Sequence, residues 1–282
     1  MHIIVTPVYN DWRSLNKLLY EINEKCKTKE LIKILIIDDF SNIKSSINIK
    51  KLNKIHEIKI LKLITNLGSQ KAITIALHYL KKIKSSFYIT IMDSDGEDSP
   101  AHIVEMLDLA KKNKDSIVVS CRKERKESLL IKTCYKIHLT LTFFLTGKWI
   151  SFGNFSSFHS KNIHKILSNN SSWHAYSAAI IKNANIKKTY STRLKRYYDK
   201  SKVSFLFLIN HSIKIMAVLY NRIFLFSLFY IFLINKLFKE FDFLLLTLIF
   251  TINILIISSI IKDYVKKNKD FLSYIKNIKK IK

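Results

Sequence analysis

The sequence predicts an α/β protein in which a doubly wound, mostly parallel sheet is followed by an amphipathic helix and two apolar helices. Three observations support this fold class. Short β-branched runs alternate with amphipathic helices, polar residues follow each run, and residues 223–238 and 243–261 are strongly apolar. Alternating strands and helices are typical of a parallel sheet. Two apolar runs with a short link are typical of a membrane hairpin.

The individual elements follow from residue type and spacing. The predicted strands are apolar and β-branched, and they cover residues 2–6, 32–37, 58–64, 87–92 and 117–120. Apolar residues recur with helical spacing over residues 12–27 and 70–83. The aromatic segment 143–158 is expected to be irregular.

Composition limits the classes of partner and compartment. The 282 residues include 48 Lys and Arg but only 21 Asp and Glu, so the net charge is +27. Such a charge favours an anionic partner, either nucleic acid or a lipid surface. Nucleic acid is not expected, because the chain has no zinc-ligand spacing, RNP-like run or basic helix-turn-helix. The three cysteines form no CxxC pair, which favours a reduced, cytosolic setting, and no signal peptide is expected.

An acidic turn follows the fourth predicted strand. Asp93, Asp95, Glu97 and Asp98 place four carboxylates in six residues. In extended geometry Asp93 and Asp95 point the same way, at the sheet edge where α/β proteins bind ligands. The chain has no G-x-G-x-x-G and no P-loop, so a metal is expected to hold any phosphates. Carboxylates suit Mg²⁺ or Mn²⁺. The alternative is a solvated acidic turn that only caps a helix.

The second half of the chain changes character. A main domain over residues 1–202 is expected to precede an interfacial amphipathic helix (203–220), a transmembrane helical hairpin (221–261) and a basic tail (262–282). Lysines at the start of that tail place it in the cytosol by the positive-inside rule. The predicted protein is therefore integral to the inner (plasma) membrane with a cytosolic main domain. The alternative is that the apolar runs are buried core helices.

Five motifs stand in order along the chain: TPVYND, DDFS, NLG, DSDGEDSP and RYYDKSK. Each is weak alone, but the ordered set resembles the family 2 inverting glycosyltransferases of GT-A fold. Within them it is similar to the polyprenyl-phosphate glycosyltransferases, which include dolichyl-phosphate mannose synthases and bactoprenol glucosyltransferases. The resemblance covers about residues 3–214, and the membrane hairpin suits the same branch.

The resemblance implies a donor site and an acceptor site. The residues it assigns to the base and ribose of a nucleotide sugar are Pro7, Tyr9, Asp11 and Asp39. Asp93 and Asp95 would bind the metal and diphosphate, with Glu97 as a further metal ligand. The residues it assigns to the acceptor phosphate are Arg122, Arg125, Lys132, Arg196, Ser201 and Lys202. Those expected to be catalytic are Asp95, Arg122, Arg196 and Lys202.

Two positions depart from the family pattern. Asp199 replaces the glycine of R-x-x-G-x-S-K, and Asn154 replaces the aspartate of a usual Gly-Asp-Phe. A lipid-phosphate nucleophile is already ionised near pH 7 and needs no general base, so the loss of that carboxylate is tolerable for a phosphate acceptor. A hydroxyl acceptor needs a positioned base.

The sequence therefore predicts a metal-dependent, inverting enzyme that moves a sugar from a nucleotide-sugar donor to undecaprenyl or dolichyl phosphate at the cytosolic face. One alternative is a family 2 enzyme that glycosylates a saccharide or lipid hydroxyl in cell-envelope glycan synthesis. Another is a non-catalytic, membrane-anchored pseudo-transferase that binds nucleotide. The sequence does not decide the sugar, the base, or whether the chain forms a homo-oligomer.

Overall fold

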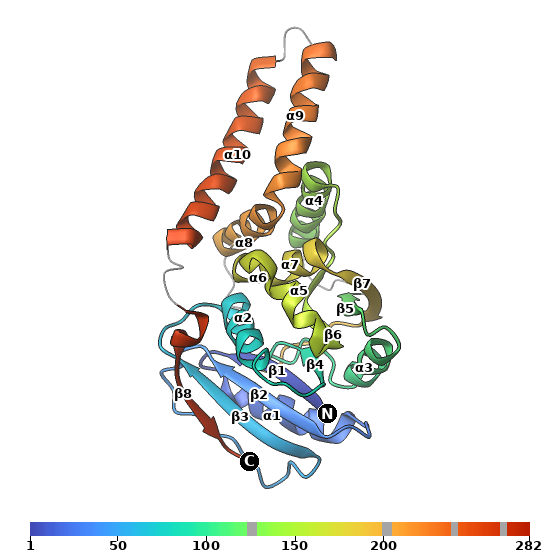
Figure 1. The fold of residues 1–282 in the computed structure, drawn as a ribbon, viewed down its shortest axis with the longest axis vertical. Coiled ribbons are helices and arrows are strands. Elements are labelled where there is room, and N and C mark those ends of the chain that lie inside the picture. The colour runs from blue at the N-terminus through green and yellow to red at the C-terminus, as the bar shows by residue number, and fades with distance from the viewer. Residues whose placement is uncertain (123–128, 199–204, 238–241, 266–269) are drawn as a thin grey trace. The chain divides into compact units, whose positions relative to one another are not determined.

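The structure is a computed structural model that describes residues 1–122, 129–198, 205–237, 242–265 and 270–282 (Figure 1). The chain forms two compact units. Unit 1 comprises residues 1–125, 152–201 and 269–282, and unit 2 comprises residues 126–151 and 202–268. Unit 1 carries the sheet, and the described elements of unit 2 are helices.

Unit 1 is built on an eight-stranded sheet with the spatial order β7-β5-β6-β4-β1-β2-β3-β8. The strands are β1 His2–Val8, β2 Ile32–Asp38, β3 Ile55–Leu63, β4 Tyr88–Ile91, β5 Ser116–Arg122, β6 Phe152–His159, β7 Asn185–Ser191 and β8 Ile275–Lys280. Strands β4, β1, β2 and β3 run parallel, and β5 is parallel to β7. Because β6 and β8 are antiparallel to their neighbours, the sheet is mixed but mostly parallel. The predicted α/β class is confirmed.

Three strands were not predicted from the sequence, and β7 is the one at the edge of the sheet next to β5. Strand β6 occupies part of the segment expected to be irregular, and it lies between β4 and β5. Strand β8 lies in the segment expected to be a basic tail, and it pairs with the outer edge of β3. Five of its six residues are exposed and three of them are lysines, so its pairing satisfies backbone groups of an edge strand rather than burying apolar surface.

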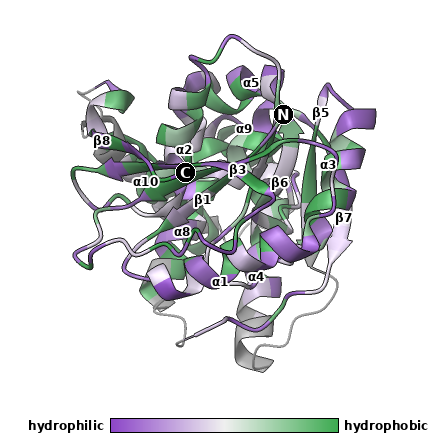
Figure 2. Ribbon diagram, turned by 90° about the horizontal axis from the view of Figure 1, so that it is seen from below, coloured by the Kyte–Doolittle hydropathy of each residue, from purple (hydrophilic) through white to green (hydrophobic). Residues whose placement is uncertain are grey.

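Helices cover both faces of the sheet. On one face lie α1 Trp12–Lys25 and α3 His102–Lys112, whose apolar residues share one buried cluster with β1, β2 and β3. On the other face α2 Ser69–Leu80 packs on β1 and β2, and it contacts the short helices α5 Ile163–Leu167, α6 Ser171–His174 and α7 Tyr176–Asn183. Figure 2 shows hydrophobic residues along the strands and hydrophilic residues on the outer loops. The central strands β1 and β2 are therefore buried on both faces, and their sequences are near-continuous apolar runs rather than alternating ones.

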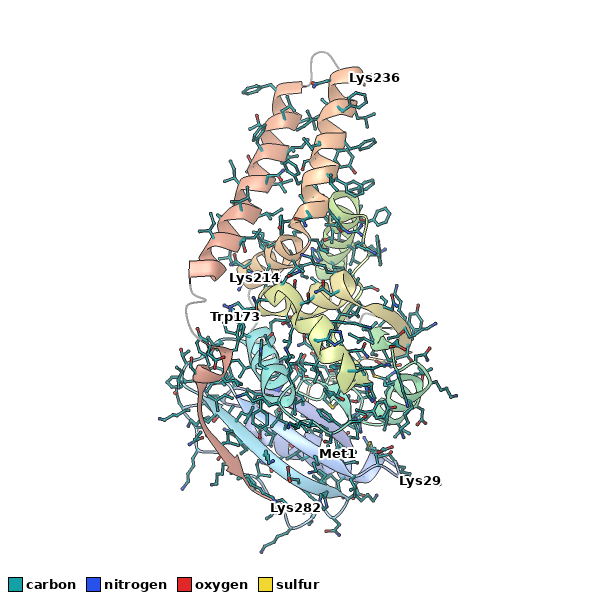
Figure 3. The ribbon with its side chains drawn as sticks, viewed as in Figure 1. Met1, Lys29, Trp173, Lys214, Lys236 and Lys282 are labelled. Carbon is teal, nitrogen blue, oxygen red and sulfur yellow. The ribbon has the colours of Figure 1, made fainter. Side chains whose placement is uncertain are left out.

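The C-terminal segment is fastened to unit 1 by aromatic contacts as well as by β8. The ring of Phe271 stacks on His78 of α2 with 4.2 Å between the ring centroids. Trp173 of α6, labelled in Figure 3, lies 5.1 Å from Phe271 and 5.6 Å from Tyr274 by the same measure. These contacts hold the end of the chain against helices of the main domain.

Unit 2 contains α4 Leu129–Thr146, α8 Phe205–Val218, α9 Tyr220–Leu237 and α10 Asp242–Val265. Helices α9 and α10 pack together as a hairpin, joined by a hydrogen bond of 3.0 Å from Asn253 Nδ2 to Ser227 Oγ (Figure 1). Helix α4 packs against α9, where the Tyr230 hydroxyl donates to the Phe144 carbonyl over 2.8 Å.

The hairpin is apolar on its outside. The stretch Phe243–Ile261 has a mean hydropathy of 2.6 with 6% of its residues buried, so it is long and apolar enough to cross a membrane. The pair Leu208–Val218 and Tyr220–Lys236 passes the same test together, but the two helices meet at 86°. Figure 3 shows side chains pointing outward along both helices of the hairpin, with Lys236 at the far end of α9. The described residues therefore contain one or two candidate spans, where the sequence predicts two.

Candidate functional site

The predicted ligand-binding edge is formed by the carboxyl ends of β1, β2 and β4. Val8 of β1 lies opposite Asp38 of β2, so the polar segments that follow these strands begin side by side. Pro7 is buried within β1, and Tyr9 directly after it is 50% exposed. Asp11 accepts a hydrogen bond of 3.1 Å from the Ser14 backbone N–H and so caps α1.

The loops after β1 and β2 are joined by an asparagine that the sequence analysis did not single out. The backbone of Asn10 has a φ of 53°, in the left-handed region where asparagine is tolerated. Its side-chain oxygen accepts hydrogen bonds from the backbone N–H groups of Asn42 at 2.8 Å and Ile43 at 3.2 Å. The positive φ and these bonds together hold Tyr9 and Asp11 at the edge of the sheet.

Asp39 is buried at the end of β2, and its carboxylate is fully engaged by backbone. Its two oxygens accept hydrogen bonds of 2.8 Å each from the N–H groups of Leu67 and Gly68. Burial raises the pKa of Asp39 to about 6, and the two N–H donors act in the opposite direction. The structure therefore places Asp39 at the predicted edge, with its carboxylate holding the Asn-Leu-Gly loop that precedes α2.

The acidic turn after β4 is folded on itself. The backbone N–H of Asp93 donates to Asp98 Oδ2 over 3.2 Å, and the N–H of Glu97 donates to Asp95 Oδ1 over 3.0 Å. Gly96 between them has a φ of 86°, which favours glycine. The turn is partly exposed, so its carboxylates are within reach of a ligand.

A basic strap, residues 193–198, lies over this acidic turn. Arg193 forms an ion pair with Glu97, and Arg196 Nη1 lies 3.4 Å from Asp95 Oδ2. Two backbone hydrogen bonds of 2.9 Å reinforce the pairing, from Leu194 N–H to the Glu97 carbonyl and from Tyr197 N–H to the Asp95 carbonyl. The sequence predicts Arg196 at the acceptor phosphate but does not predict Arg193, because these partners are distant in the chain.

The strap gives a second reason, besides the positive φ, why residue 96 is a glycine. A Cβ added there would lie 2.4 Å from the ring of Tyr197. The centroid of the Tyr197 ring also lies 4.6 Å from Lys17 Nζ of α1. Tyr198 receives the Arg13 guanidinium at 3.8 Å. Cation–π contacts to α1 therefore hold the strap in place.

A chain of side-chain amides ends on Asp93. Gln70 Oε1 accepts from the Tyr176 backbone N–H over 2.7 Å, and Gln70 Nε2 donates to Asn154 Oδ1 over 2.6 Å. Asn154 Nδ2 then donates to Asp93 Oδ1 over 3.0 Å. The sequence analysis missed Gln70, although it is the only glutamine in the chain.

The donor set of the acidic turn fits a hard divalent ion. Mg²⁺ or Mn²⁺ takes one or two carboxylates and fills its other positions with water and phosphate oxygens. Asp93 and Asp95 supply oxygens of this kind at a partly exposed strand end. Among the described residues, however, no three His, Cys, Asp or Glu side chains converge, and Glu97 is paired with Arg193. The structure thus does not bring Asp93, Asp95 and Glu97 together as one three-carboxylate site.

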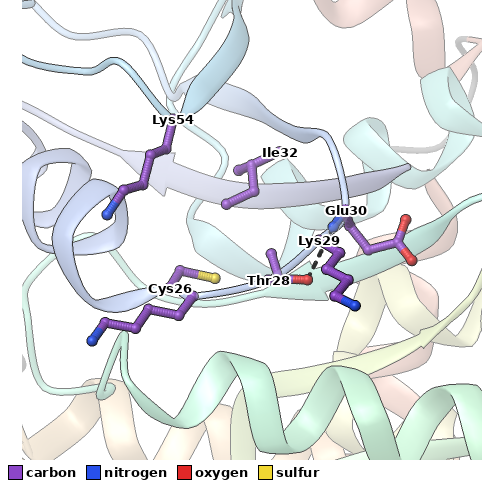
Figure 4. A pocket seen from close by; sticks show the side chains of 7 residues that line it. Cys26, Thr28, Lys29, Glu30, Ile32 and Lys54 are labelled. Carbon is purple, nitrogen blue, oxygen red and sulfur yellow. Dashed lines mark hydrogen bonds between the residues drawn. The ribbon is translucent and has the colours of Figure 1, made fainter.

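Several predicted acceptor-site residues lie outside this description. Arg125, Ser201 and Lys202 are not among the described residues, and of Arg122 and Lys132 only the backbone is described, in β5 and α4. A hollow of about 360 Å³, lined by Cys26, Lys29 and Lys54 among others, lies by Ile32 at the start of β2 (Figure 4). Because ligands of α/β sheets bind at the carboxyl ends of strands, this hollow is separate from the candidate site.

Several known proteins are similar to this chain in sequence. Residues 3–170 match the model of glycosyl transferase family 2. The undecaprenyl-phosphate 4-deoxy-4-formamido-L-arabinose transferase of Salmonella choleraesuis is 27% identical over 215 residues, which are 73% of this chain and 64% of that protein. An uncharacterized glycosyltransferase of Bacillus subtilis, YkcC, is 29% identical over 131 residues, 46% of this chain and 39% of that one. The chain thus spans less than two thirds of the length of these relatives.

Solved structures show the same fold at low identity. The glucosyl-3-phosphoglycerate synthase of Mycobacterium tuberculosis, in complex with Mn²⁺, UDP and phosphoglyceric acid, has a TM-score of 0.51 and 14% identity, covering 79% of this chain and 78% of that one. A mycobacterial protein has a TM-score of 0.54 and 11% identity, covering 79% and 74%. These likenesses concern the fold, whereas the family model covers more than half of the chain. The chain belongs to glycosyl transferase family 2.

Proposed function

We propose that this protein is a metal-dependent, inverting glycosyltransferase that moves a sugar from a nucleotide-sugar donor to a polyprenyl phosphate at the cytosolic face of the membrane. The observation that carries the proposal is the contact between the acidic turn and the basic strap. A carboxylate pair suited to a metal–diphosphate and arginines suited to a second phosphate lie at one edge of the sheet.

The donor half of the site would be formed by the ends of β1, β2 and β4. Asp93 and Asp95 would hold Mg²⁺ or Mn²⁺, which when bound neutralises the leaving diphosphate. Tyr9 and Asp11, at the adjacent edge, would contact the nucleoside, with Pro7 and Asp39 shaping its site. The mycobacterial synthase of like fold was solved with Mn²⁺ and UDP, which supports this assignment.

The acceptor half would be formed by the strap and the basic residues that flank it. Arg196, Ser201 and Lys202 directly precede α8 in the chain, and the apolar helices follow. A lipid phosphate enters from the headgroup level, so residues next to the membrane segment suit it. The remaining residues assigned to this phosphate are Arg122, Arg125 and Lys132. The undecaprenyl-phosphate specificity named for the Salmonella relative supports the same acceptor class.

The acceptor chemistry also favours phosphate over a hydroxyl. A hydroxyl nucleophile needs a base within hydrogen-bond reach. Asn154 has no carboxylate, and its amide is engaged with Asp93 and Gln70. A phosphate oxygen is already ionised, so orientation by arginine and lysine is sufficient, and a single in-line displacement would invert the anomeric centre.

Chain connectivity supports a membrane hairpin with both ends on the cytosolic side. Unit 1 precedes α8, and β8 of unit 1 follows α10. The segment between them must therefore leave and return on the same side of the membrane. Lys262, Lys266, Lys267 and Lys269 follow the second apolar run in the sequence, and the positive-inside rule favours the cytosol for that side. Protease-sensitive tags at Lys239 and Lys282 should be protected on opposite sides of the membrane, and cleavage of both from one side would contradict this topology.

Membranes containing the full chain, incubated with a panel of radiolabelled nucleotide sugars and extracted with organic solvent, test the function. We expect label in a polyprenyl-phosphate lipid, and EDTA should abolish its formation. Label in a saccharide or in a lipid without a phosphate link would favour the hydroxyl acceptor. Nucleotide binding without any transfer would favour the non-catalytic alternative.

A further inference from the structure

The amide chain that ends on Asp93 has a fixed direction. Tyr176 contributes a backbone N–H, which can only donate, so the Gln70 atom that faces it must be its oxygen. Gln70 therefore presents its NH₂ group to Asn154, and Asn154 presents its own NH₂ group to Asp93. In each amide the oxygen accepts one hydrogen bond and the NH₂ group donates one. If either amide were flipped, these hydrogen bonds would be lost.

The amide chain is anchored in hydrogen-bonded parts of the fold. Gln70 lies in the first turn of α2, directly after the loop that Asp39 holds through Leu67 and Gly68. Tyr176 is fully buried, and its hydroxyl hydrogen bonds with Ser156 of β6 at 2.8 Å. Rigid anchors at both ends mean that the position of Gln70 fixes the position of Asn154, and through it one oxygen of Asp93.

We propose that Gln70 is a positioning residue for the metal site, acting through Asn154 on Asp93. A neutral donor at one Asp93 oxygen holds the carboxylate in one rotamer and leaves its other oxygen available to a divalent cation. The inference rests on the proposed function, because it takes Asp93 to be a metal ligand. Gln70 itself contacts neither the metal nor the substrate.

The isosteric variant Gln70→Glu separates this role from packing. The introduced carboxylate still accepts from the Tyr176 N–H, but it offers no hydrogen to Asn154. The Asn154 side chain then lies between two carboxylates and can direct its NH₂ group toward only one of them. Its carbonyl oxygen then faces the other carboxylate, which is unfavourable in either orientation. We expect Mn²⁺ affinity in the presence of UDP to fall about tenfold, the scale of outer-partner effects at metal sites.

The variant Asn154→Asp perturbs the same chain with the opposite pH signature. It places a carboxylate about 3.0 Å from Asp93 Oδ1, where two such groups share a proton. The deficit in Mn²⁺ affinity relative to wild type should therefore grow as pH falls from 7 to 5. For Gln70→Glu the deficit should shrink over the same range, because the introduced carboxyl regains a donor when protonated. A purely structural role for Gln70 would give no such opposite trends.

The measurement is a Mn²⁺ titration of the full chain in detergent with UDP present, followed by the electron paramagnetic resonance of free Mn²⁺. Thr74→Val is the matched control, because the Thr74 hydroxyl hydrogen bonds with the backbone carbonyls of Gln70 and Ser172, so its loss perturbs the same turn of α2 while the side-chain amides of Gln70 and Asn154 are unchanged. It should lower the melting temperature and leave Mn²⁺ affinity unchanged. Wild-type protein that binds no Mn²⁺ would overturn the metal-dependent function together with this inference. Wild-type binding with unchanged affinity in Gln70→Glu would overturn the inference alone.

Discussion

Two acidic strand ends in this protein look alike in sequence and differ in how their carboxylates are satisfied. At the end of β2, Asp39 is buried and both oxygens are held by backbone N–H groups. At the end of β4, Asp93 and Asp95 are partly exposed and each has one carboxylate oxygen next to a side chain, namely Asn154 and Arg196, while the second Asp95 oxygen accepts from the Glu97 backbone N–H. Backbone partners cannot leave without unfolding a loop, whereas side-chain partners can exchange for a ligand. We therefore propose a structural task for Asp39 and a ligand-binding task for the D-x-D pair.

The largest effect is expected from Asp95→Ala. Removing a metal ligand should lower turnover by at least about 10³-fold, comparable to the loss of a strong electrostatic contact to the transition state. The melting temperature should change little, because the carboxylate is partly exposed and its partner Arg196 can turn to solvent. Steady-state kinetics and thermal unfolding check both. Undiminished activity, in this variant or in EDTA, would contradict the metal assignment.

Asp39→Asn should instead lower the stability of the protein more than its turnover. The amide keeps one acceptor and turns an NH₂ group toward a backbone N–H, leaving a buried donor unsatisfied, which costs about 1–3 kcal/mol of unfolding free energy. Denaturant unfolding at pH 7 measures the loss. A variant as stable as wild type but impaired in nucleotide affinity would move Asp39 from the structural to the ligand-binding class.

Arg196→Ala tests the exchangeable partner of Asp95. Loss of a charged contact to phosphate should raise the apparent KM for polyprenyl phosphate, or lower kcat, by about ten- to a hundredfold. Nucleotide binding in the presence of metal should not weaken, because the ion pair with Asp95 competes with the metal. Calorimetric titration with nucleotide, alongside kinetics in lipid phosphate, checks this. Weakened nucleotide binding with unchanged lipid dependence would reverse the assignment.

The most gradual effect concerns the pH dependence of stability. Burial raises the pKa of Asp39 from 3.8 to about 6, so the folded state holds its proton more tightly than the unfolded chain. Its contribution to stability is present below pH 3.8 and is lost as pH rises through 6, by about 1.4 kcal/mol for each pH unit. His2, whose pKa burial lowers to about 3, acts in the opposite direction. The effect is therefore measured as the difference between wild type and Asp39→Asn, and a constant difference from pH 4 to 6 would refute it.

Much of the fold could be predicted because its signals are local. The strands before residue 123 are apolar and β-branched, and helices α1 and α2 have clear helical spacing. Strand β6 was not predicted, because its serines and phenylalanines become a strand only between β4 and β5. Strand β8 was not predicted either, because a lysine-rich segment carries no core pattern and its place depends on the free edge of β3.

The candidate site shows the same division. The D-x-D pair, Asp39 and Arg196 could be found because they lie in short motifs. Their partners could not, because Gln70 and Arg193 reach the acidic turn across long sequence separations. Residue type suggests the chemistry of a site, but the hydrogen-bond and ion-pair partners of each carboxylate depend on tertiary contacts.

The pairing of β8 with β3 has a consequence for biosynthesis. Because β8 follows α10 in the chain, the ribosome completes both apolar helices before it delivers the strand that covers the edge of β3. Until then that edge presents unpaired backbone groups, which template association with other chains. The sheet of unit 1 can therefore be completed only after both helices of the hairpin have been synthesised. A chain truncated after α10 would keep every motif of the site but would expose the unpaired, aggregation-prone edge of β3.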